Sequence, residues 1–303
     1  MLSIIIVSWN TSRLLENCLH SILANPPMLP FEIWVVDNAS TDDSPRMVRE
    51  KFPRVHLIEN RENVGFARAN NQAMQQCAGK YVLLLNPDTL VASGALQALV
   101  DFLAENSDAG AAGGRLRNPD GSLQISSHPQ PTLSREFWRM FHLDVLAPYA
   151  AYPLTKWETD EPQEVDILMG ACLVLRKECL NEVGLLDEDY FMYSEEVDLC
   201  HRILSAGWRL YWVPGAEVVH FGGQSSQQAP TEMFLKLYHS KVIYFRKHYG
   251  WWAVYLYKSV LRMAAFSRLL LAPFTIFEDS PRRQRHLTLV DRYWRLVLAL
   301  PGM

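Results

Sequence analysis

Three polar stretches of the sequence carry residue types that could do chemistry. Asp88 follows an apolar run, and a carboxylate there can hold Mg²⁺ or Mn²⁺, which stabilises negative charge on leaving phosphate oxygens. Glu195 and Glu196 lie in an acidic cluster, where a carboxylate can take the proton from an attacking hydroxyl. Asp37 ends another apolar run and can accept a hydrogen bond from a nucleobase N–H or a ribose hydroxyl. Together these residues indicate a metal-assisted transfer from a phosphate-containing donor.

Each stretch also has a purely structural explanation. The sequence from Asn86 to Thr89 is a good turn. Acidic residues after an N-cap at Ser194 would oppose a helix dipole, and Asp198 could pair with Arg202 one turn later. His220 follows an apolar run and could be structural or merely exposed. The choice between these explanations depends on the elements that position the residues.

The first third of the chain alternates apolar runs with stretches of helical periodicity. We expect strands at Ser3–Trp9, Glu32–Asp37, Val55–Glu59 and Tyr81–Asn86, and helices between them, including Phe66–Cys77 and Ser93–Asn106 with Ser93 as the cap. Strands that are apolar throughout and separated by helices predict a parallel sheet covered on both faces. Ligands bind such sheets at the carboxyl ends of the strands.

Polar residues follow these predicted strands at the expected edge of the sheet. Ser8 and Asn10 follow the first strand, Asp37 and Asn38 the second, and Asn86 and Asp88 the fourth. No GxGxxG follows the first strand, which argues against a dinucleotide site. The pattern predicts an α/β fold with a binding crevice, although Asn38 could equally be a plain turn former.

Seven strings in order now carry a family resemblance: SIIIVSWN, WVVDNAST, ENVGFARANN, LLLNPDT, MGACLVLRKE, YFMYSEEVDLCHR and VVHFGG. The chain resembles family 2 glycosyltransferases, most closely the rhamnosyltransferase-type branch that builds bacterial surface polysaccharides. The resemblance covers roughly residues 3 to 222. It implies the GT-A fold, which is Rossmann-like, with a mostly parallel central sheet and helices on both faces.

The resemblance assigns the metal and the base. It makes Asp88 the last Asp of a DXD-type metal motif whose first Asp is replaced here by Asn86, and it makes His220 a further ligand to Mg²⁺ or Mn²⁺. The general base maps onto Glu196, where the family usually has Asp, with Glu195 as the alternative base or an acceptor contact. The expected reaction is an inverting transfer by a single in-line displacement.

Ten residues are expected to bind the donor or acceptor. In similar enzymes Asp37 reads the nucleobase, and Arg68 would supply positive charge near the base or the diphosphate. Small residues around Gly170 would let the backbone approach a sugar closely. The full expected set is Ser8, Asn10, Asp37, Asn38, Asn63, Gly65, Arg68, Asn70, Asn86 and Gly170.

The composition indicates the compartment of the protein and the division of the chain into domains. The chain has 303 residues, and its five scattered cysteines form no CxxC pair, which fits a reducing cytoplasm; the start has no basic stretch typical of a signal peptide. From Lys241 onward eleven Lys and Arg face three acids, so this part carries +8 and the first 240 residues −12. We expect a catalytic domain over residues 1–230 and a basic, aromatic helical tail over residues 231–303.

The tail is expected to lie on the inner face of the cytoplasmic membrane. Lys258, Arg262 and Arg268 interrupt the apolar stretch Trp251–Phe277, which favours an amphipathic surface helix over a membrane span. A second helix is expected over Leu287–Leu300. The alternatives are a helical lid on the catalytic domain or a homo-oligomer contact, and no motif points to nucleic acid.

The predicted function is therefore transfer of a sugar from a nucleotide diphosphate to a saccharide or lipid-linked acceptor in surface glycan synthesis. The resemblance favours L-rhamnose from dTDP-L-rhamnose. A UDP- or GDP-sugar donor is one alternative, and a nucleotide-binding scaffold subunit without turnover is another.

Overall fold

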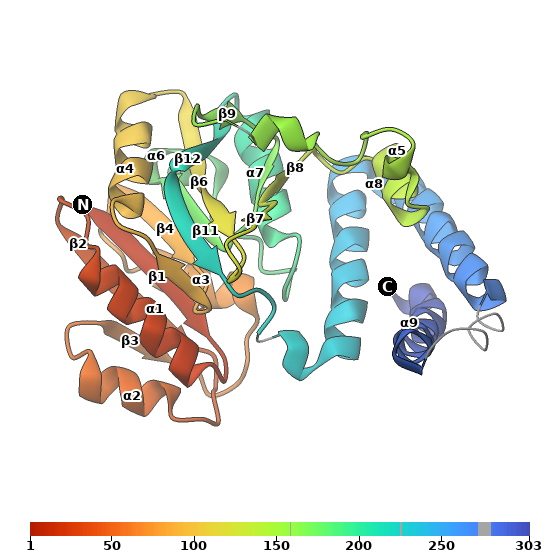
Figure 1. Cartoon of the computed structure of the whole chain (residues 1–303), viewed down its shortest axis with the longest axis horizontal. Helices are drawn as coiled ribbons and strands as arrows, with labels where there is room; N and C mark the ends of the chain where they lie inside the picture. Colours follow the sequence, from red (N-terminus) through yellow and green to blue (C-terminus); the bar gives the residue numbers. More distant parts are fainter. Residues whose placement is uncertain (158, 225, 272–279) are drawn as a thin grey trace. The chain divides into compact units, whose positions relative to one another are not determined.

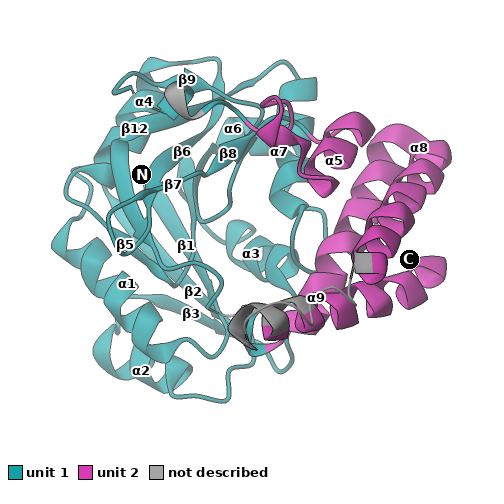
Figure 2. Cartoon of the chain, turned by 45° about the vertical axis from the view of Figure 1, so that its right-hand side comes forward, with its two compact units in different colours: residues 1–130, 152–228 teal, residues 131–151, 229–303 magenta. Residues whose placement is uncertain are grey.

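The computed structural model describes residues 1–157, 159–224, 226–271 and 280–303. The chain divides into two compact units: unit 1 comprises residues 1–130 and 152–228, and unit 2 comprises residues 131–151 and 229–303 (Figure 2). The second segment of unit 2 begins at residue 229, and the sequence analysis set its domain limit at residue 230. Residues 131–151, which the sequence grouped with the catalytic domain, belong instead to the unit that contains the C-terminal helices.

Unit 1 is built on a mixed sheet in the order β3-β2-β1-β4-β11-β6-β12-β5 (Figure 1). The main strands are β1 (Leu2–Ser8), β2 (Phe31–Asp37), β3 (His56–Glu59), β4 (Tyr81–Leu85), β5 (Thr89–Val91), β6 (Ala109–Arg117), β11 (Cys172–Arg176) and β12 (Arg209–His220). Short strands are β7 (Leu123–Gln124), β8 (Ser127–His128), β9 (Gln163–Glu164) and β10 (Ile167–Leu168). Strands β3, β2, β1 and β4 are parallel, as predicted.

The other half of the sheet is antiparallel in part, which the sequence did not indicate. Strand β11 runs antiparallel to both β4 and β6, and β5 runs antiparallel to β12. Strand β12 shifts register between Val213 and Glu217, where Pro214 removes a backbone donor. Because of this irregularity one long strand pairs with β6 along most of its length and brings its end, His220, opposite Thr89 of β5.

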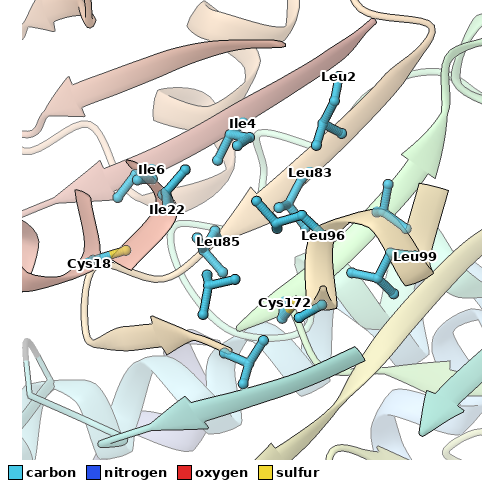
Figure 3. Packing of buried hydrophobic residues seen from close by; sticks show 14 of the residues in the cluster. Leu2, Ile4, Ile6, Cys18, Ile22, Leu83, Leu85, Leu96, Leu99 and Cys172 are labelled. Atoms are coloured by element: carbon cyan, nitrogen blue, oxygen red, sulfur yellow. The ribbon is translucent and has the colours of Figure 1, made fainter. Parts of the chain in front are cut away.

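Helices cover the sheet because its strands carry apolar side chains on both faces. They are α1 (Ser12–Ala24), α2 (Ser44–Lys51), α3 (Phe66–Met74), α4 (Ala95–Glu105), α6 (Lys177–Val183) and α7 (Glu195–Ser205), with short 3₁₀ turns η2 (Leu154–Trp157) and η3 (Ser226–Gln228). On one face Ile4, Leu83 and Cys172 pack with Cys18 of α1 and Leu96 of α4 in a single buried cluster (Figure 3). This close packing fixes the strand ends that carry the polar residues.

Two helix caps differ from prediction. Helix α4 begins at Ala95 after Gly94, which takes a left-handed φ of 77°, so Ser93 is not the cap. Ser194 does precede α7, but its φ is 65° and its hydroxyl makes no capping hydrogen bond. The expected pair between Asp198 and Arg202 is confirmed, with Nε and Oδ2 2.8 Å apart.

Unit 2 consists of α5 (Leu133–Met140), α8 (Pro230–Leu271), α9 (Ser280–Ala299) and the 3₁₀ turns η1 (Leu143–Val145) and η5 (Leu300–Gly302). Gly250, with φ 80°, breaks α8 into two helical segments. The fully buried Glu136 of α5 accepts from Lys241 of α8 at 2.6 Å and pairs with Arg139 at 3.2 Å, so its charge is compensated. The expected helix over Trp251–Phe277 is described as far as Leu271, and its remainder lies outside the described residues.

Among the helices that the structure describes, none is long and apolar enough to span a membrane.

Candidate active site

The first part of the site lies where β1 and β2 end side by side. Ser8 pairs with Asp37 in register, and strand order reverses between β1 and β4, the position at which sheets of this kind bind ligands. Asp37 is buried; its Oδ2 accepts from the Ser40 backbone N–H at 2.9 Å, whereas its buried Oδ1 has no partner in the described structure. Burial raises the pKa of Asp37 above its ordinary value. A ligand N–H or hydroxyl would satisfy the open oxygen.

Asn10 and Asn38 serve the protein itself. Asn10 takes a left-handed φ of 52°, its backbone N–H donates to the Ser40 hydroxyl at 2.9 Å, and its side-chain Oδ1 accepts from the Thr41 N–H at 2.7 Å. The buried Asn38 amide donates to Asn63 Oδ1 (2.8 Å) and the Gly65 carbonyl (3.2 Å). It also accepts, from Asn60 Nδ2 at 3.2 Å and the Val64 N–H at 3.0 Å. Asn38 thus has its hydrogen bonds filled by the loop that it shapes.

The remaining donor-side residues differ in exposure. Asn70 is buried in α3 and donates to the Phe66 carbonyl at 2.9 Å, which is a local helix contact. The side chain of Arg68 is 60% exposed, and its Nε lies 3.8 Å from Glu188, so it is not held at the strand ends by a close partner. Ser8 pairs its hydroxyl with Thr11 at 2.9 Å. Ligand roles for these residues stay predictions.

Asp88 and His220 meet at the second part of the site, although 132 positions separate them in the sequence. Both are buried, and His220 Nε2 lies 3.3 Å from Asp88 Oδ1. A backbone hydrogen bond connects the same two segments, because the Phe221 N–H donates to the Asp88 carbonyl at 2.9 Å. Asn86 lies beside them, with its Nδ2 3.3 Å from His220 Nε2. The structure therefore brings the three expected metal-motif residues together.

This pair has the chemistry of a partial cation site. His220 Nδ1 lies 2.6 Å from Gln124 Oε1, so the ring donates its proton there and leaves the Nε2 lone pair facing the carboxylate. Two acceptors 3.3 Å apart suit a shared cation, since two ligands at right angles and about 2.1 Å from Mg²⁺ would be about 3.0 Å apart. Within the described ranges no group of three or more His, Cys, Asp and Glu side chains is arranged so that it could hold a metal ion by itself. Asp88 and His220 would hold the ion together with donor oxygens and water.

Glu195 and Glu196 begin α7 and form the third part of the site. Tyr193 and Ser194 both take left-handed φ values, 67° and 65°, which costs energy for residues with a Cβ. Glu195 is buried, Glu196 is half-buried, and one oxygen of each is buried without a partner in the described structure. Burial raises both pKa values, and the negative charge of Glu196 adds to the rise at Glu195. Carboxyls with raised pKa values suit proton transfer near neutral pH.

Contacts at two glycines link the chain segments that carry the three parts of the site. The Phe66 N–H donates to the Phe191 carbonyl at 2.7 Å, and a Cβ on Gly65 would lie 2.5 Å from that carbonyl, so only glycine fits. A Cβ on Gly170 would lie 3.8 Å from Glu196 Cβ, which is an ordinary contact. The protein itself therefore leaves room for a larger side chain at this position, and a ligand could use that space. The Ala171 carbonyl accepts from the Asn86 N–H at 3.0 Å, which connects Gly170 to the metal motif.

Sequence reasoning missed Gln124 and Phe191. The turn residues from Asn118 to Gly121 indicate a hairpin, so a short strand at Leu123–Gln124 could have been found. That this strand would bring a side chain to His220 depends on β6 lying beside β12, which local sequence does not encode.

Comparison with known proteins decides the family. The model of glycosyl transferase family 2 matches residues 3–184. This chain belongs to glycosyl transferase family 2. Unit 1 has the GT-A fold, and this protein is a glycosyltransferase.

Relatives of this family 2 glycosyltransferase differ in how much of their length is matched. The N-acetylglucosaminyl-diphospho-decaprenol L-rhamnosyltransferase of Mycobacterium tuberculosis is 32% identical, over 94% of this chain and 95% of its own length. The low-salt glycan biosynthesis hexosyltransferase Agl10 of Haloferax volcanii is 25% identical, over 66% and 61%. The mannosyltransferase PcManGT of Pyrobaculum calidifontis, solved with GDP-Man and Mn²⁺, has a TM-score of 0.55 at 19% identity, over 99% of this chain and 86% of its own.

Proposed function

We propose that this glycosyltransferase inverts the anomeric centre while it passes L-rhamnose from dTDP-L-rhamnose to a lipid-linked saccharide in surface glycan synthesis. The observation that carries the proposal is the close approach of Asp88 to His220, with Oδ1 and Nε2 3.3 Å apart. This contact supports a cation-binding pair, and the open carboxyl of Glu196 beside Gly170 supports a proton acceptor. A protein that only bound nucleotides would not need the buried, open carboxylates of Glu195 and Glu196.

Donor binding falls to the ends of β1 and β2. Asp37 would accept from the base or ribose through Oδ1, the oxygen without a partner in the described structure. The saturated Asn38 network holds the surrounding loop in shape, so this carboxylate is oriented before the ligand arrives. A divalent ion held by Asp88 and His220 would stabilise the negative charge on the departing nucleoside diphosphate.

Transfer itself needs one proton acceptor. An acceptor hydroxyl oxygen forms the new bond to the anomeric carbon as the bond from that carbon to the phosphate oxygen breaks. The hydroxyl proton passes to Glu196, and the electron pair of the broken bond leaves with the nucleoside diphosphate. Glu196 is the half-buried member of its pair and lies beside Gly170, whereas Glu195 is buried and would orient the acceptor. A single displacement of this kind inverts the anomeric centre.

The identity of the sugar and the acceptor rests on likeness. The mycobacterial relative matched over nearly its full length is named for L-rhamnosyl transfer to N-acetylglucosaminyl-diphospho-decaprenol. The resemblance of the motifs to the rhamnosyltransferase branch points the same way. The competing donors are GDP- and UDP-sugars, since two solved chains of similar fold hold GDP-Man and UDP.

Unit 2 supports a lipid-linked acceptor. On α8, beyond Gly250, a series of large apolar side chains faces outward: Trp251, Trp252, Tyr255, Leu256, Met263, Phe266 and Leu270. Arg262 is exposed among them, and the chain from Lys241 onward carries +8. Aromatic side chains beside cations suit the headgroup layer of an anionic membrane. We propose that this apolar face of α8 binds the inner surface of the cytoplasmic membrane.

Glu196→Gln tests the base. We expect kcat to fall about 10²- to 10⁴-fold at saturating donor, because the amide no longer accepts the proton. Nucleotide binding should be unchanged, and the exposed Glu105→Gln on α4 should behave as the unaltered protein. Near-normal turnover of Glu196→Gln would remove the base from this residue. Activity lost only in Glu195→Gln would transfer the role to its neighbour.

Two binding measurements test the partners. Thermal shifts with dTDP, UDP and GDP in the presence of Mn²⁺ should be largest for dTDP, and a preference for GDP would overturn the rhamnosyl assignment.

Vesicles containing phosphatidylglycerol should sediment the protein, and Trp251→Ser with Trp252→Ser should weaken that binding. The exposed Met28→Ser of unit 1 is the matched control. Equal sedimentation of both variants would disprove a membrane role for the apolar face.

A further inference from the structure

The hairpin β6–β7 carries a row of polar side chains that ends on His220. Gln124 of β7 places Oε1 2.6 Å from His220 Nδ1. Its Nε2 lies 2.9 Å from Asn118 Oδ1 and 3.4 Å from the His220 carbonyl. The amide therefore holds the same histidine through its ring and its backbone. No part of the transfer chemistry described above uses Gln124.

The far end of this row fixes the direction of every hydrogen bond. The Asp120 carboxylate can only accept, and it takes the Ser122 hydroxyl proton at 2.6 Å. Ser122 Oγ is then left to accept from Asn118 Nδ2, at 2.9 Å. This turns Asn118 Oδ1 toward Gln124 Nε2, and so Gln124 Oε1 toward the imidazole. A side chain that could also donate would not impose this order.

We infer that the chain Asp120–Ser122–Asn118–Gln124 is a positioning device that holds His220 as the Nδ1–H tautomer, with Nε2 bare toward Asp88. A second contact agrees, because Asn86 Nδ2 faces Nε2 at 3.3 Å as a donor to that lone pair. The other tautomer would place a proton on the nitrogen that faces Asp88 and block it as a metal ligand. The inference rests on the metal role proposed for Asp88 and His220.

The hairpin also has the local features needed to keep the row in place. The Asn118 N–H donates to the Ser122 carbonyl at 2.8 Å, and Gly121 takes the left-handed φ of 84° that closes the turn. The Ser122 contacts lower the pKa of Asp120, so its carboxylate stays an acceptor across the neutral range. The device is thus built into a turn outside the crevice and reaches the site through one amide.

Nitrogen-15 NMR of histidine-labelled protein tests the tautomer without metal or substrate. At about pH 8 the His220 signals should show a protonated Nδ1 and a bare Nε2. The signals are assigned by their loss in His220→Gln. Gln124→Leu, which keeps the volume and removes the acceptor, should shift the population toward Nε2–H. Gln124→Glu, which keeps an acceptor toward Nδ1, should retain the original pattern.

Binding of Mn²⁺ alone, followed by electron paramagnetic resonance, gives the second readout. Gln124→Leu should weaken Mn²⁺ binding about 10- to 100-fold, as losses of outer hydrogen-bond partners do, and Gln124→Glu should restore it. Asp120→Asn should cause a smaller loss, because its amide can accept or donate and no longer fixes the direction. An unchanged tautomer in Gln124→Leu would overturn the inference. Undiminished Mn²⁺ binding by His220→Gln would instead refute the proposed metal role.

Discussion

The loop after β2 and the start of α7 both bury polar side chains, but they treat them in opposite ways. In the loop, the Asn38 amide makes four hydrogen bonds to its own protein. At α7, Glu195 and Glu196 each bury an oxygen that has no partner in the described structure, and they lie next to each other. The first arrangement stabilises the fold, whereas the second costs stability and leaves atoms open for a ligand. Substitutions in the two regions should therefore have effects of opposite sign on stability.

Asp88→Asn should give the largest effect, because it removes a carboxylate proposed to hold the ion. We expect transfer to fall about 10²- to 10³-fold, a loss comparable to removing one electrostatic contact to the developing charge. The melting temperature should not fall, because the amide keeps the shape of the carboxylate. Steady-state assays with Mn²⁺, beside a melting curve, measure both quantities. The exposed Asp101→Asn serves as the control, and a variant that loses activity by unfolding would contradict the comparison.

Asn38→Ala should show the reverse pattern. Its removal leaves buried donors and acceptors of the 60–65 loop unpaired, so we expect the free energy of unfolding to fall by about 2–3 kcal/mol. Urea denaturation measures this change, and the exposed Asn17→Ala on α1 is a matched control that should change it little. Activity in Asn38→Ala should fall through a raised KM for the donor, with a smaller change in kcat. An unchanged unfolding midpoint would show that the network contributes nothing to stability.

Glu195→Gln should give the smallest effect, and a stabilising one. Burial and the Glu196 charge raise the folded-state pKa of Glu195 above its unfolded value. The protonated form is therefore favoured by folding, so this stabilisation is present at low pH and is lost as pH rises through the raised pKa. A glutamine cannot ionise, so the variant should melt higher than the parent near neutral and alkaline pH, with the difference vanishing in acid.

Melting curves across pH test this sign. A lower melting temperature for Glu195→Gln at alkaline pH would mean that the two carboxylates do not repel each other.

The same electrostatics predicts how catalysis depends on pH. Activity should fall as pH drops through the raised pKa of Glu196, because the base is then protonated. Glu196→Gln should lose this acidic limb from its residual rate.

Much of the fold could be predicted because local signals and global structure agree in the first third of the chain. Strands Leu2–Ser8 and Tyr81–Leu85 are buried along their whole length and mostly apolar, a pattern that favours a sheet covered on both faces. Strand β11 has the same apolar character but runs antiparallel. Apolar content reports burial and carries no direction, so the mixed half of the sheet could not be predicted.

The members of the candidate site could be proposed from the sequence, whereas their contacts could not. Asp37, Asp88, Glu196 and His220 were singled out because carboxylates and imidazole stand out after apolar strands and in ordered motifs. Gln124 carries no such signal, since a glutamine in a two-residue strand is common on any surface. Its meaning comes from a histidine 96 positions away.

The sequence by itself determined the family, the parallel strands and the residue types that can hold a cation or accept a proton, because these depend on short-range pattern and side-chain chemistry. Only the tertiary structure decided which of those groups stay open. Whether a buried oxygen finds a partner depends on pairings such as β5 with β12 and Gly65 with Phe191, which join distant parts of the chain. Packing thus closed the Asn38 loop and left the carboxylates of α7 without partners in the described structure.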